Sequence, residues 1–566
     1  MKARRVANPK AAKQPTRSAK TNSSLKELLS TEAALVAIVS LVVIVFVVYA
    51  NSFGNEFVFD DIYLVKGNQR ARNLDLSLLL HSYRPLRDFS YAIDFAVWGE
   101  GPFGFHLTNL LLHAGNVLLV FTLIRRLTED LSSAFLAALI FAVHPIQTDA
   151  VTYISGRRDL LFTLFYLWSF HTYISYYGSR SLRAVLLFTI FFLLWAMSLL
   201  SKEMAVSFPI LIFVWHYCNA WEVTTSWWRQ ILPTAGRTLA RDKWLWILVA
   251  VPGVAFGFYT VLFTGASSRA KNLEYWGGSF YSNALTVIRV HAWYLKQLVF
   301  PTPIAQYLGV FEPSQSFFEW QVVIAFVVVS SVLVYGFWLL NRDRLMAFAI
   351  FSYFVMLLPV SQIIPHHELL ADHYLYLPMM SFGLFVALVV RKITSRGRTA
   401  AKLAYSSVAI ILLALAVMTV LQNRTWKDER SLWTANYKAV PNSPRAALNL
   451  GNTYQESEPE KAEALFKRAL GLNPTPTIKR TLYDRMVVLL IHQQKFDEAE
   501  FFVREVLERS PRDFFGNLWA GQIHTFKKEC TRAQEELDRA QSAAVNPRQV
   551  TLVQEAQQQF KQQCGI

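Results

Sequence analysis

Two neighbouring carboxylates, Asp60 and Asp61, directly follow a long apolar segment in the string NEFVFDDIYLV. A carboxylate held against a membrane surface can remove a proton from a hydroxyl group, and its pKa is easily shifted there. The same pair is equally typical of a solvated turn or of the first turn of a helix. The spacing alone therefore leaves a catalytic and a structural interpretation open.

Cations and further acids stand at the ends of other apolar segments. They lie in the strings HPIQTDAVTYISGRRDL (144–160) and LLSKEMA (199–205), in residues 284–300, and in PHHELLADHYLYLP (365–378); their members include His144, Asp149, Arg157, Arg158, Asp159, Lys202, Glu203, Arg289, Lys296, Glu368, Asp372 and His373. Arginine binds phosphate oxygens in a bidentate manner, so such a group can hold a phosphate. The alternative is that these side chains only reach toward lipid head groups.

The composition indicates which elements must position these residues. Of the 566 residues, 53% are hydrophobic and only 17% are charged, whereas soluble domains carry about 25% charged residues. Half of the net charge of +16 lies in residues 1–26, which hold eight basic residues and no acidic one. This pattern excludes a purely soluble enzyme and a disordered chain. It predicts a multi-spanning membrane protein whose basic N-terminal tail stays in the cytoplasm.

Eleven apolar segments are long enough to be membrane spans. They lie near 33–50, 106–124, 131–146, 160–177, 184–200, 204–219, 244–264, 319–340, 345–364, 374–390 and 401–421. The segment 284–300 has the length of a span but contains Arg289 and Lys296, which are costly inside a bilayer. We therefore expect it to be an amphipathic helix at the outer interface, and an odd number of spans then places the C-terminal tail outside.

The tail is periodic. Three helical patterns end at Pro474, Pro511 and Pro547, which are 37 and 36 residues apart. These spacings are near the 34-residue period of tetratricopeptide repeats. Stacked helix pairs of this kind form a curved surface suited to extended peptides, although they also serve as spacers or dimer contacts. Cys530 and Cys564 can pair if the tail lies in an oxidising compartment, and the sequence does not decide this.

Several strings, in order along residues 50–380, carry a family resemblance. FDDIYLVKGN, SYRPLRDFSYAIDF, FGFHLTNLLLHAGNVLLV, HPIQTDAVTYISGRRDLL, LLSKEMA, WYLKQLVFPTPI and ADHYLYLP resemble blocks of the TMTC family of transmembrane and tetratricopeptide-repeat O-mannosyltransferases. The combination is more specific than any one block. The chain departs from the family pattern where Asp372 and His373 replace the usual Glu-Arg.

The resemblance implies an all-α, polytopic GT-C glycosyltransferase that uses a sugar linked to polyprenyl phosphate on the outer face. It implies residues 1–30 as a basic cytoplasmic tail, 31–422 as the transmembrane glycosyltransferase domain and 423–566 as an extracytoplasmic tetratricopeptide-repeat domain. The expected location is the cytoplasmic (inner) membrane, with the tail in the periplasm and binding a protein or glycan acceptor; no nucleic acid is expected. An endoplasmic reticulum location keeps the same topology.

The same resemblance implies roles for individual residues. Asp60 or Asp61 is the expected general base of an inverting transfer, and either can also hold Mg²⁺ or Mn²⁺ against the phosphate. The expected substrate-binding residues are Arg84, Arg157, Lys202, Glu203, Arg289, Asp372 and His373, with Arg84 more plausibly bracing its loop. His106, Asn109 and His113 share one helical face, and we expect hydrogen bonds between helices there rather than substrate contacts.

Two other functions fit parts of the sequence. A membrane-anchored scaffold would use the repeats to recruit partners, but eleven spans with polar clusters on one side exceed what an anchor needs. A transporter of lipid-linked glycans would place ionisable residues near the middle of the bilayer. Here these residues gather at the segment ends instead, which favours the glycosyltransferase.

Overall fold

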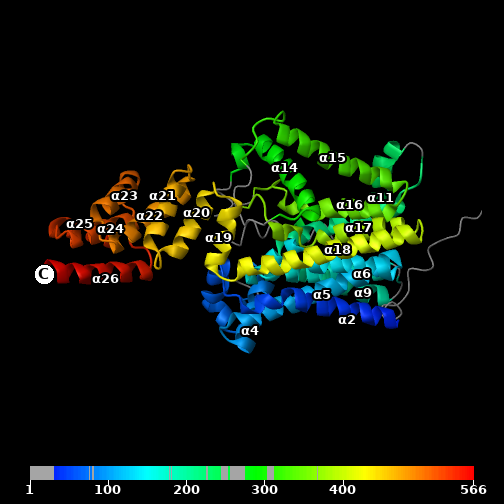
Figure 1. Cartoon of the computed structure of the whole chain (residues 1–566), viewed down its shortest axis with the longest axis horizontal. Helices are drawn as coiled ribbons and strands as arrows, with labels where there is room; N and C mark the ends of the chain where they lie inside the picture. The colour runs from blue at the N-terminus through cyan, green and yellow to red at the C-terminus, as the bar shows by residue number, and fades with distance from the viewer. Residues whose placement is uncertain are drawn as a thin grey trace, which may run out of the picture. The chain divides into compact units, whose positions relative to one another are not determined.

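The computed structural model describes residues 31–566 except for 76, 79–81, 178, 180–181, 225–226, 242, 244–245, 247–252, 255, 257–273, 303–311, 366–367 and 566. Within these residues every regular element is a helix, as an all-α chain requires (Figure 1). The predicted basic tail, residues 1–30, lies outside the described residues, as does nearly all of the apolar segment 244–264.

The chain divides into two compact units, the first ending at Arg424 and the second beginning at Thr425, with Glu312 also grouped with the second. The longer helices of the first unit are α2 (Glu32–Tyr49), α4 (Pro85–Trp98), α5 (Pro102–Thr128), α6 (Leu131–Val143), α8 (Arg157–Tyr177), α9 (Leu182–Ser201), α10 (Phe208–Ala220), α11 (Ile231–Arg241), α14 (Phe280–Val299), α15 (Trp320–Leu340), α16 (Arg344–Leu357), α17 (Met379–Thr394) and α18 (Arg398–Asn423). Short 3-10 or π turns connect several of them.

A helix occupies each of the ten expected apolar segments that lie in the described residues. Among those residues, five helices are long and apolar enough to cross a membrane: α5, α9, α15 and the segments Glu32–Gly54 and Arg398–Trp426. The bent pair Leu131–Val143 and Pro145–Val151 makes a sixth candidate. These helices make the chain a multi-spanning membrane protein, while the total of eleven spans stays a prediction.

The amphipathic segment at 284–300 forms most of helix α14. Ser279 caps the helix through its side chain, which accepts from the backbone N–H of Ser282. Tyr294 on α14 both donates to the carbonyl of Ala371 and accepts from its N–H. The helix thereby fixes the backbone that precedes Asp372. Its position at a membrane interface stays a prediction.

Small residues allow the helices of the first unit to pack closely. A Cβ atom on Gly383 of α17 would lie 2.8 Å from the carbonyl oxygen of Ala137 on α6, so only glycine fits at this contact. Helix α8 packs against both α5 and α9, and α6 packs against α5 and α17. Figure 1 shows α2, α5, α6, α17 and α18 running along one another. Tight packing of this kind holds the ends of the helices, and thus their connecting loops, in fixed places.

One asparagine at the end of α18 joins two of these connections. The Asn423 amide donates to the carbonyl of Val48 and to the side chain of Asn51. Its side-chain oxygen accepts from the Thr152 hydroxyl at 2.6 Å, and Asn55 donates to its backbone carbonyl. The segments that follow α2 and precede α8 are therefore fastened to the same residue.

The second unit consists of consecutive helix pairs. Its helices are α19 (Glu429–Ala439), α20 (Pro444–Tyr454), α21 (Pro459–Leu470), α22 (Pro476–His492), α23 (Phe496–Arg509), α24 (Phe514–Phe526), α25 (Cys530–Ala543) and α26 (Pro547–Cys564). Gly451 of α20 packs against Phe466 of α21, and Gly521 of α24 packs against Leu537 of α25. Each pair thus combines a small residue with a large one. The assignment as tetratricopeptide repeats stays a prediction.

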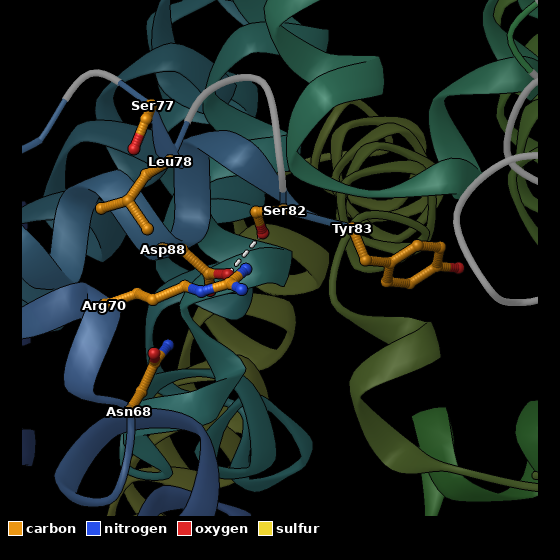
Figure 2. A pocket seen from close by; sticks show the side chains of 7 residues that line it. All are labelled: Asn68, Arg70, Ser77, Leu78, Ser82, Tyr83 and Asp88. Carbon is orange, nitrogen blue, oxygen red and sulfur yellow. Dashed lines mark hydrogen bonds between the residues drawn. The ribbon is translucent and has the colours of Figure 1, made fainter.

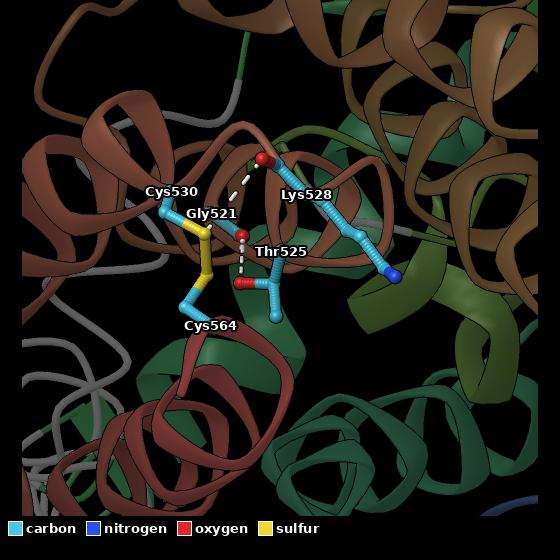
Figure 3. Close-up of a disulfide and its surroundings, with 5 residues drawn as sticks. All are labelled: Gly521, Thr525, Lys528, Cys530 and Cys564. Atoms are coloured by element: carbon cyan, nitrogen blue, oxygen red, sulfur yellow. Dashed lines mark hydrogen bonds between the residues drawn. A yellow bond between two sulfur atoms is a disulfide. The ribbon is translucent and has the colours of Figure 1, made fainter. Parts of the chain in front are cut away.

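A disulfide between Cys530 and Cys564 joins the start of α25 to the end of α26 (Figure 3). The two Cα atoms are 6.0 Å apart, which is a usual separation for a disulfide. The sequence left this pairing open. Cys218 is a free, buried thiol in α10, as its apolar surroundings suggested.

Candidate functional site

Asp60 and Asp61 begin a short helical segment after the connection that follows α2. Phe59, just before them, has a φ of 54°, a left-handed conformation that is rare for a bulky residue. This sharp change of direction turns Asp61 inward, where only 1% of its surface is exposed, and leaves Asp60 partly exposed. The two carboxylates therefore have different environments despite being neighbours.

Asp61 is held by hydrogen bonds from the protein. Its Oδ1 accepts from the backbone N–H of Ser155 at 2.7 Å and from the Ser155 hydroxyl at 2.5 Å, and its Oδ2 accepts from the N–H of Val58. Burial raises the pKa of this carboxyl to about 7, although the hydrogen bonds act in the opposite direction. Because Ser155 lies two residues before Arg157, the segments around residues 60 and 157 meet directly.

Arg157, at the start of α8, is completely buried in contacts with the protein. Its guanidinium donates to Asn109 at 2.7 Å, to the carbonyl of Phe105 at 2.8 Å and to the carboxylate of Asp94. It also lies 5.0 Å from the centre of the Tyr91 ring. We call Arg157, Asp94 and Asn109 the arginine network. The network joins α4, α5 and α8, so the guanidinium of Arg157 holds these three helices together.

Three cations, Arg84, Arg158 and Lys202, lie close to one another in the first unit. Arg84, at the N-terminus of α4, donates to both carboxylate oxygens of Glu203 at 2.8 and 3.1 Å. Lys202 places its ammonium 2.6 Å from Asp159, and the Nε of Arg158 lies 3.4 Å from the other oxygen of the same carboxylate. The charges of Arg84 and Arg158 also act on Lys202. We call Arg84, Arg158 and Lys202 the cation cluster.

The cluster is mostly buried and well supported. The Lys202 side chain is 1% exposed and lies 4.9 Å from the centre of the Tyr374 ring. Burial lowers the pKa of Lys202, and the neighbouring Asp159 opposes this effect. Three cations face only two carboxylates, those of Asp159 and Glu203, so one positive charge is left in excess in a mostly buried region. A buried excess charge stabilises an anion more than an exposed cation would.

His373 and Asp372 border this cluster. His373 donates its backbone N–H and its Nδ1–H to Asp149, both at 3.0 Å, which turns its Nε2 toward Arg158 at 3.5 Å. The Nε2 also lies 3.7 Å from Glu368. Burial, together with the charge of Asp149, raises the pKa of Asp372 well above its usual range. The structure thus brings the segments 149–159, 202–203 and 368–374 together.

Arg289 contacts a different part of the chain from the cation cluster. Its guanidinium donates to the hydroxyl of Ser314 at 2.7 Å, on the loop before α15. The same arginine acts electrostatically on Glu319, at the N-terminus of α15. The structure therefore groups the predicted residues Arg84, Lys202, Glu203 and His373 together, and it ties Arg289 to the loop before α15.

A cavity of about 480 Å³ lies beside the cluster. It is lined by Asn68, Arg70, Ser77, Leu78, Ser82, Tyr83 and Asp88 (Figure 2). Ser82 and Asp88 are hydrogen-bonded within its wall. Tyr83, another lining residue, is subject to the charges of Glu203, Arg84 and Arg158, which places the cavity at the edge of the cation cluster.

The polar face of α5 forms hydrogen bonds between segments, as the sequence predicted. His106 contacts the carbonyl of Asn55, and Asn109 donates to the carbonyls of Val151 and Tyr153. His113 lies 2.7 Å from the hydroxyl of Tyr376. The predicted hydrogen bonds are present, and the three side chains help to hold the loops that carry Asp61 and Arg158.

The residues around Asp60 and Asp61 do not resemble a metal site. Within the described part of the chain, no three His, Cys, Asp or Glu side chains converge in a way that suits a metal ion. The oxygens of Asp61 already accept from N–H and O–H groups. The binding of Mg²⁺ or Mn²⁺ by Asp60 or Asp61 stays a prediction, and we derive no chemical step from it.

The family motif in the sequence pointed to Arg157, whereas the cluster contains Arg158. The string GRRDL offered both arginines, and no sequence signal separates them. Asp94 was also missed as the partner of Arg157, because it lies in a helix whose polar residues have no distinctive spacing. Asp149 and Asp159 stand in the string that the sequence had already marked as polar.

Comparison with known proteins finds protein O-mannosyl-transferases among the relatives of this chain. Protein O-mannosyl-transferase F38B6.6 of Caenorhabditis elegans is 23% identical over 454 residues, covering 75% of this chain and 61% of that protein. Protein O-mannosyl-transferase TMTC3 of Mus musculus is 25% identical over 479 residues, covering 77% and 51%. TMTC4 of Homo sapiens is 34% identical over 197 residues, covering 28% and 26%.

These matches confirm the resemblance that the motifs indicated. The chain spans 61% and 51% of the length of the first two relatives. No protein-family model matches the chain.

Two solved structures have a weaker similarity to this chain. The Archaeoglobus fulgidus oligosaccharyltransferase, tethered to an acceptor peptide, is 12% identical with a TM-score of 0.40, covering 79% of this chain and 60% of that one. ArnT from Cupriavidus metallidurans, bound to undecaprenyl phosphate, is 13% identical with a TM-score of 0.36, covering 78% and 76%. Likenesses of this size do not determine the function of the chain.

Proposed function

Given this likeness to the TMTC O-mannosyltransferases, we propose that the chain is an integral-membrane glycosyltransferase. It transfers a sugar from a polyprenyl-phosphate donor to a hydroxyl group of a protein or glycan. The observation that supports this most is the cation cluster of Arg84, Arg158 and Lys202, which lies beside a cavity in the same unit as Asp60 and Asp61. The name of the relatives makes mannose the first sugar to test.

The transfer requires that the negative charge of the leaving phosphate is stabilised and that the proton of the acceptor hydroxyl is removed. The acceptor oxygen forms a bond to C1 of the sugar while the bond between C1 and the phosphate oxygen breaks, with inversion at C1. The hydroxyl proton passes to a carboxylate, and the electron pair of the broken bond stays on the polyprenyl phosphate. Arg158 and Lys202 stabilise that negative charge, which is the main electrostatic demand of the step.

The two aspartates have separate roles in this proposal. Asp60 is partly exposed and can reach an acceptor hydroxyl, so it is the general base. Asp61 is buried and accepts from Ser155 and Val58, so it positions the segment that carries Asp60. Removing a general base typically costs a factor of about 10² to 10⁴ in rate.

The C-terminal unit supports a proposal for where the reaction takes place. Disulfides persist in oxidising compartments, so the Cys530–Cys564 bond favours a tail outside the cytoplasm. An inner-membrane enzyme with its active site on the outer face and its helical tail in the periplasm fits this arrangement. In our proposal the tail binds or positions the acceptor. Stacked helix pairs present a surface suited to an extended chain.

The test is glycan analysis of envelope proteins from cells that produce the full chain or its Asp60→Asn variant. We expect the variant to lose most of the glycan, since its amide cannot accept the proton. Glu56→Gln is the matched control, because Glu56 is exposed in the same loop and its change also removes one carboxylate. Protein levels in the membrane must be equal for all samples.

Three outcomes separate the possible functions. Loss of glycan in Asp60→Asn but not in Glu56→Gln supports the glycosyltransferase. Unchanged glycans in cells lacking the chain, together with loss of proteins that associate with the tail, favour a scaffold. Accumulation of lipid-linked sugar on the inner leaflet, measured by a flux assay, favours a transporter.

A further inference from the structure

A second cavity, of about 250 Å³, lies in the first unit away from the loops that carry Asp60 and the cation cluster. It is lined by His216 and Ala220 at the end of α10, by Glu222, and by Arg237, Thr238 and Arg241 of α11. Because α10 begins at Phe208, just after the segment that holds Glu203, it runs from the cluster to this cavity. A helix of this length spans about 20 Å. Figure 1 shows α11 and α4 at opposite ends of the helix bundle.

The two arginines of the cavity are positioned by one helix. Arg237 and Arg241 are four residues apart on α11, so their side chains lie on one face, one turn apart. Thr234 and Thr238 are buried on the adjoining side and anchor the helix to the unit. The Arg241 guanidinium lies 5.6 Å from the centre of the Tyr177 ring, at the end of α8. Arg241 is therefore placed against the end of α8, with Arg237 one turn before it on the same helix.

The opposite side of α11 is apolar and exposed. Leu232 is 80% exposed and Leu239 is 50% exposed, and their spacing of seven residues places them on one stripe. Trp228, just before the helix, is 59% exposed and contacts Arg229. An amphipathic helix with exposed leucines, a nearby tryptophan and arginines on its polar face is typical of a helix that lies in the membrane interface.

We propose that this cavity binds the phosphate head group of an anionic membrane phospholipid. Two arginines one helical turn apart can hold the oxygens of a single phosphate. Leu232 and Leu239 would then lie among the acyl chains of the same leaflet, which places the head group at the depth of the arginines. The cavity and the exposed apolar face both belong to the short helix α11. A ligand at the cavity would therefore lie next to the membrane, so we take a membrane lipid as its source. The proposal does not depend on the proposed transferase function.

One lining residue opposes an anion. Glu222 pairs with Arg237 at 3.3 Å, but both side chains are more than half exposed, and such pairs are weak. An incoming phosphate competes with the Glu222 carboxylate for Arg237. Removing the charge of Glu222 should therefore strengthen binding, whereas removing either arginine should weaken it. These opposite signs make the test sharp.

The experiment uses the purified full chain in mixed micelles and follows thermal stability during titration with phosphatidylglycerol or phosphatidylcholine. We expect saturable stabilisation by phosphatidylglycerol only. Near an anionic surface, one arginine contributes about a fivefold change in affinity, so Arg237→Gln and Arg241→Gln should each weaken binding by about that factor. Arg183→Gln, an exposed charge at the start of α9, is the matched control and should bind as the wild type does.

Glu222→Gln keeps the proposal testable if an arginine variant fails to fold. It should bind phosphatidylglycerol more tightly than the wild type, and unchanged or weaker binding would contradict the proposal. Equal stabilisation by both lipids, or equal losses in Arg183→Gln and Arg237→Gln, would also overturn it. A parallel titration with inorganic phosphate identifies the source of the ligand. Stabilisation by free phosphate that prevents any lipid effect would show a site for a soluble anion instead.

Discussion

Arg157 and Arg158 are neighbours in the chain and differ completely in their surroundings. Arg157 donates to Asn109, Asp94 and the carbonyl of Phe105, and it is entirely buried. Arg158 lies near Asp159 and His373, within the cation cluster. One arginine joins helices to one another, and the other contributes charge to the candidate site.

Helix geometry explains the difference. Successive residues of an α-helix point about 100° apart, so two adjacent side chains at the start of α8 face different neighbours. Arg157 faces α4 and α5, whereas Arg158 faces the segment around His373. The comparison shows that one charged motif supplies both a residue that joins helices and a residue of the candidate site, and that tertiary packing separates the two.

The largest expected effect is on stability. Arg157→Gln leaves the carboxylate of Asp94 buried without its charged partner, and breaking a buried pair in this way costs about 3–5 kcal/mol. We expect a large fall in the unfolding temperature of the purified protein. The double variant Arg157→Met with Asp94→Leu removes both charges and should regain much of the loss. Equal instability of the single and double variants would show that the pair is not the cause.

The next effect concerns activity. Arg158→Gln removes one cation from the cluster, and the loss of one such group costs about 10² to 10³ in rate. The glycan yield should fall strongly while the unfolding temperature changes much less than in Arg157→Gln. A comparable loss of stability in both variants would remove the distinction between the two arginines.

A pH dependence should separate Asp61 from its neighbour. The pKa of Asp61 is raised from 3.8 to about 7 in the folded protein, so between these values the folded state binds more protons than the unfolded state. This contribution to stability is present at low pH and is lost as the pH rises toward 7. Each unit of pKa shift corresponds to about 1.4 kcal/mol.

Asp61→Asn cannot titrate, so its stability relative to the wild type should rise between pH 4 and 7. Thermal unfolding of both proteins over this range measures the difference. Asp60→Asn is the control, and a similar trend in both variants would contradict the assignment to Asp61.

The smallest effect is expected at Arg289. Its guanidinium donates to Ser314, so Arg289→Gln should lower the glycan yield much less than Arg158→Gln does. A loss as large as that of Arg158→Gln would bring Arg289 back into the site, as the family resemblance implied.

Much of the fold follows from local sequence. Long apolar runs such as 319–340 and 401–421 form helices because nearly every side chain in them favours an apolar environment. The recurring prolines of the tail likewise stand near helix ends, and Pro547 begins α26. These features depend on neighbouring residues and are visible without any tertiary information.

The candidate site could be predicted less completely from the sequence than the helices. The sequence predicted that polar residues gather in the loops between apolar segments. The structure brings three of these residues, Lys202, Glu203 and His373, together. The sequence did not distinguish Asp60 from Asp61, because burial of one and exposure of the other depend on the left-handed turn at Phe59. It also could not pair Arg157 with Asp94, which is 63 residues away in the chain.

The disulfide between Cys530 and Cys564 affects how the helices of the tail unfold. In an array of stacked helix pairs each helix is held only by its neighbours, so a helix that loses those contacts can separate from the array. Here α26 is covalently joined to α25, so the two helices stay together while the bond is intact. A reducing environment would break this bond, and α26 would then be held by packing alone and be more open to proteases.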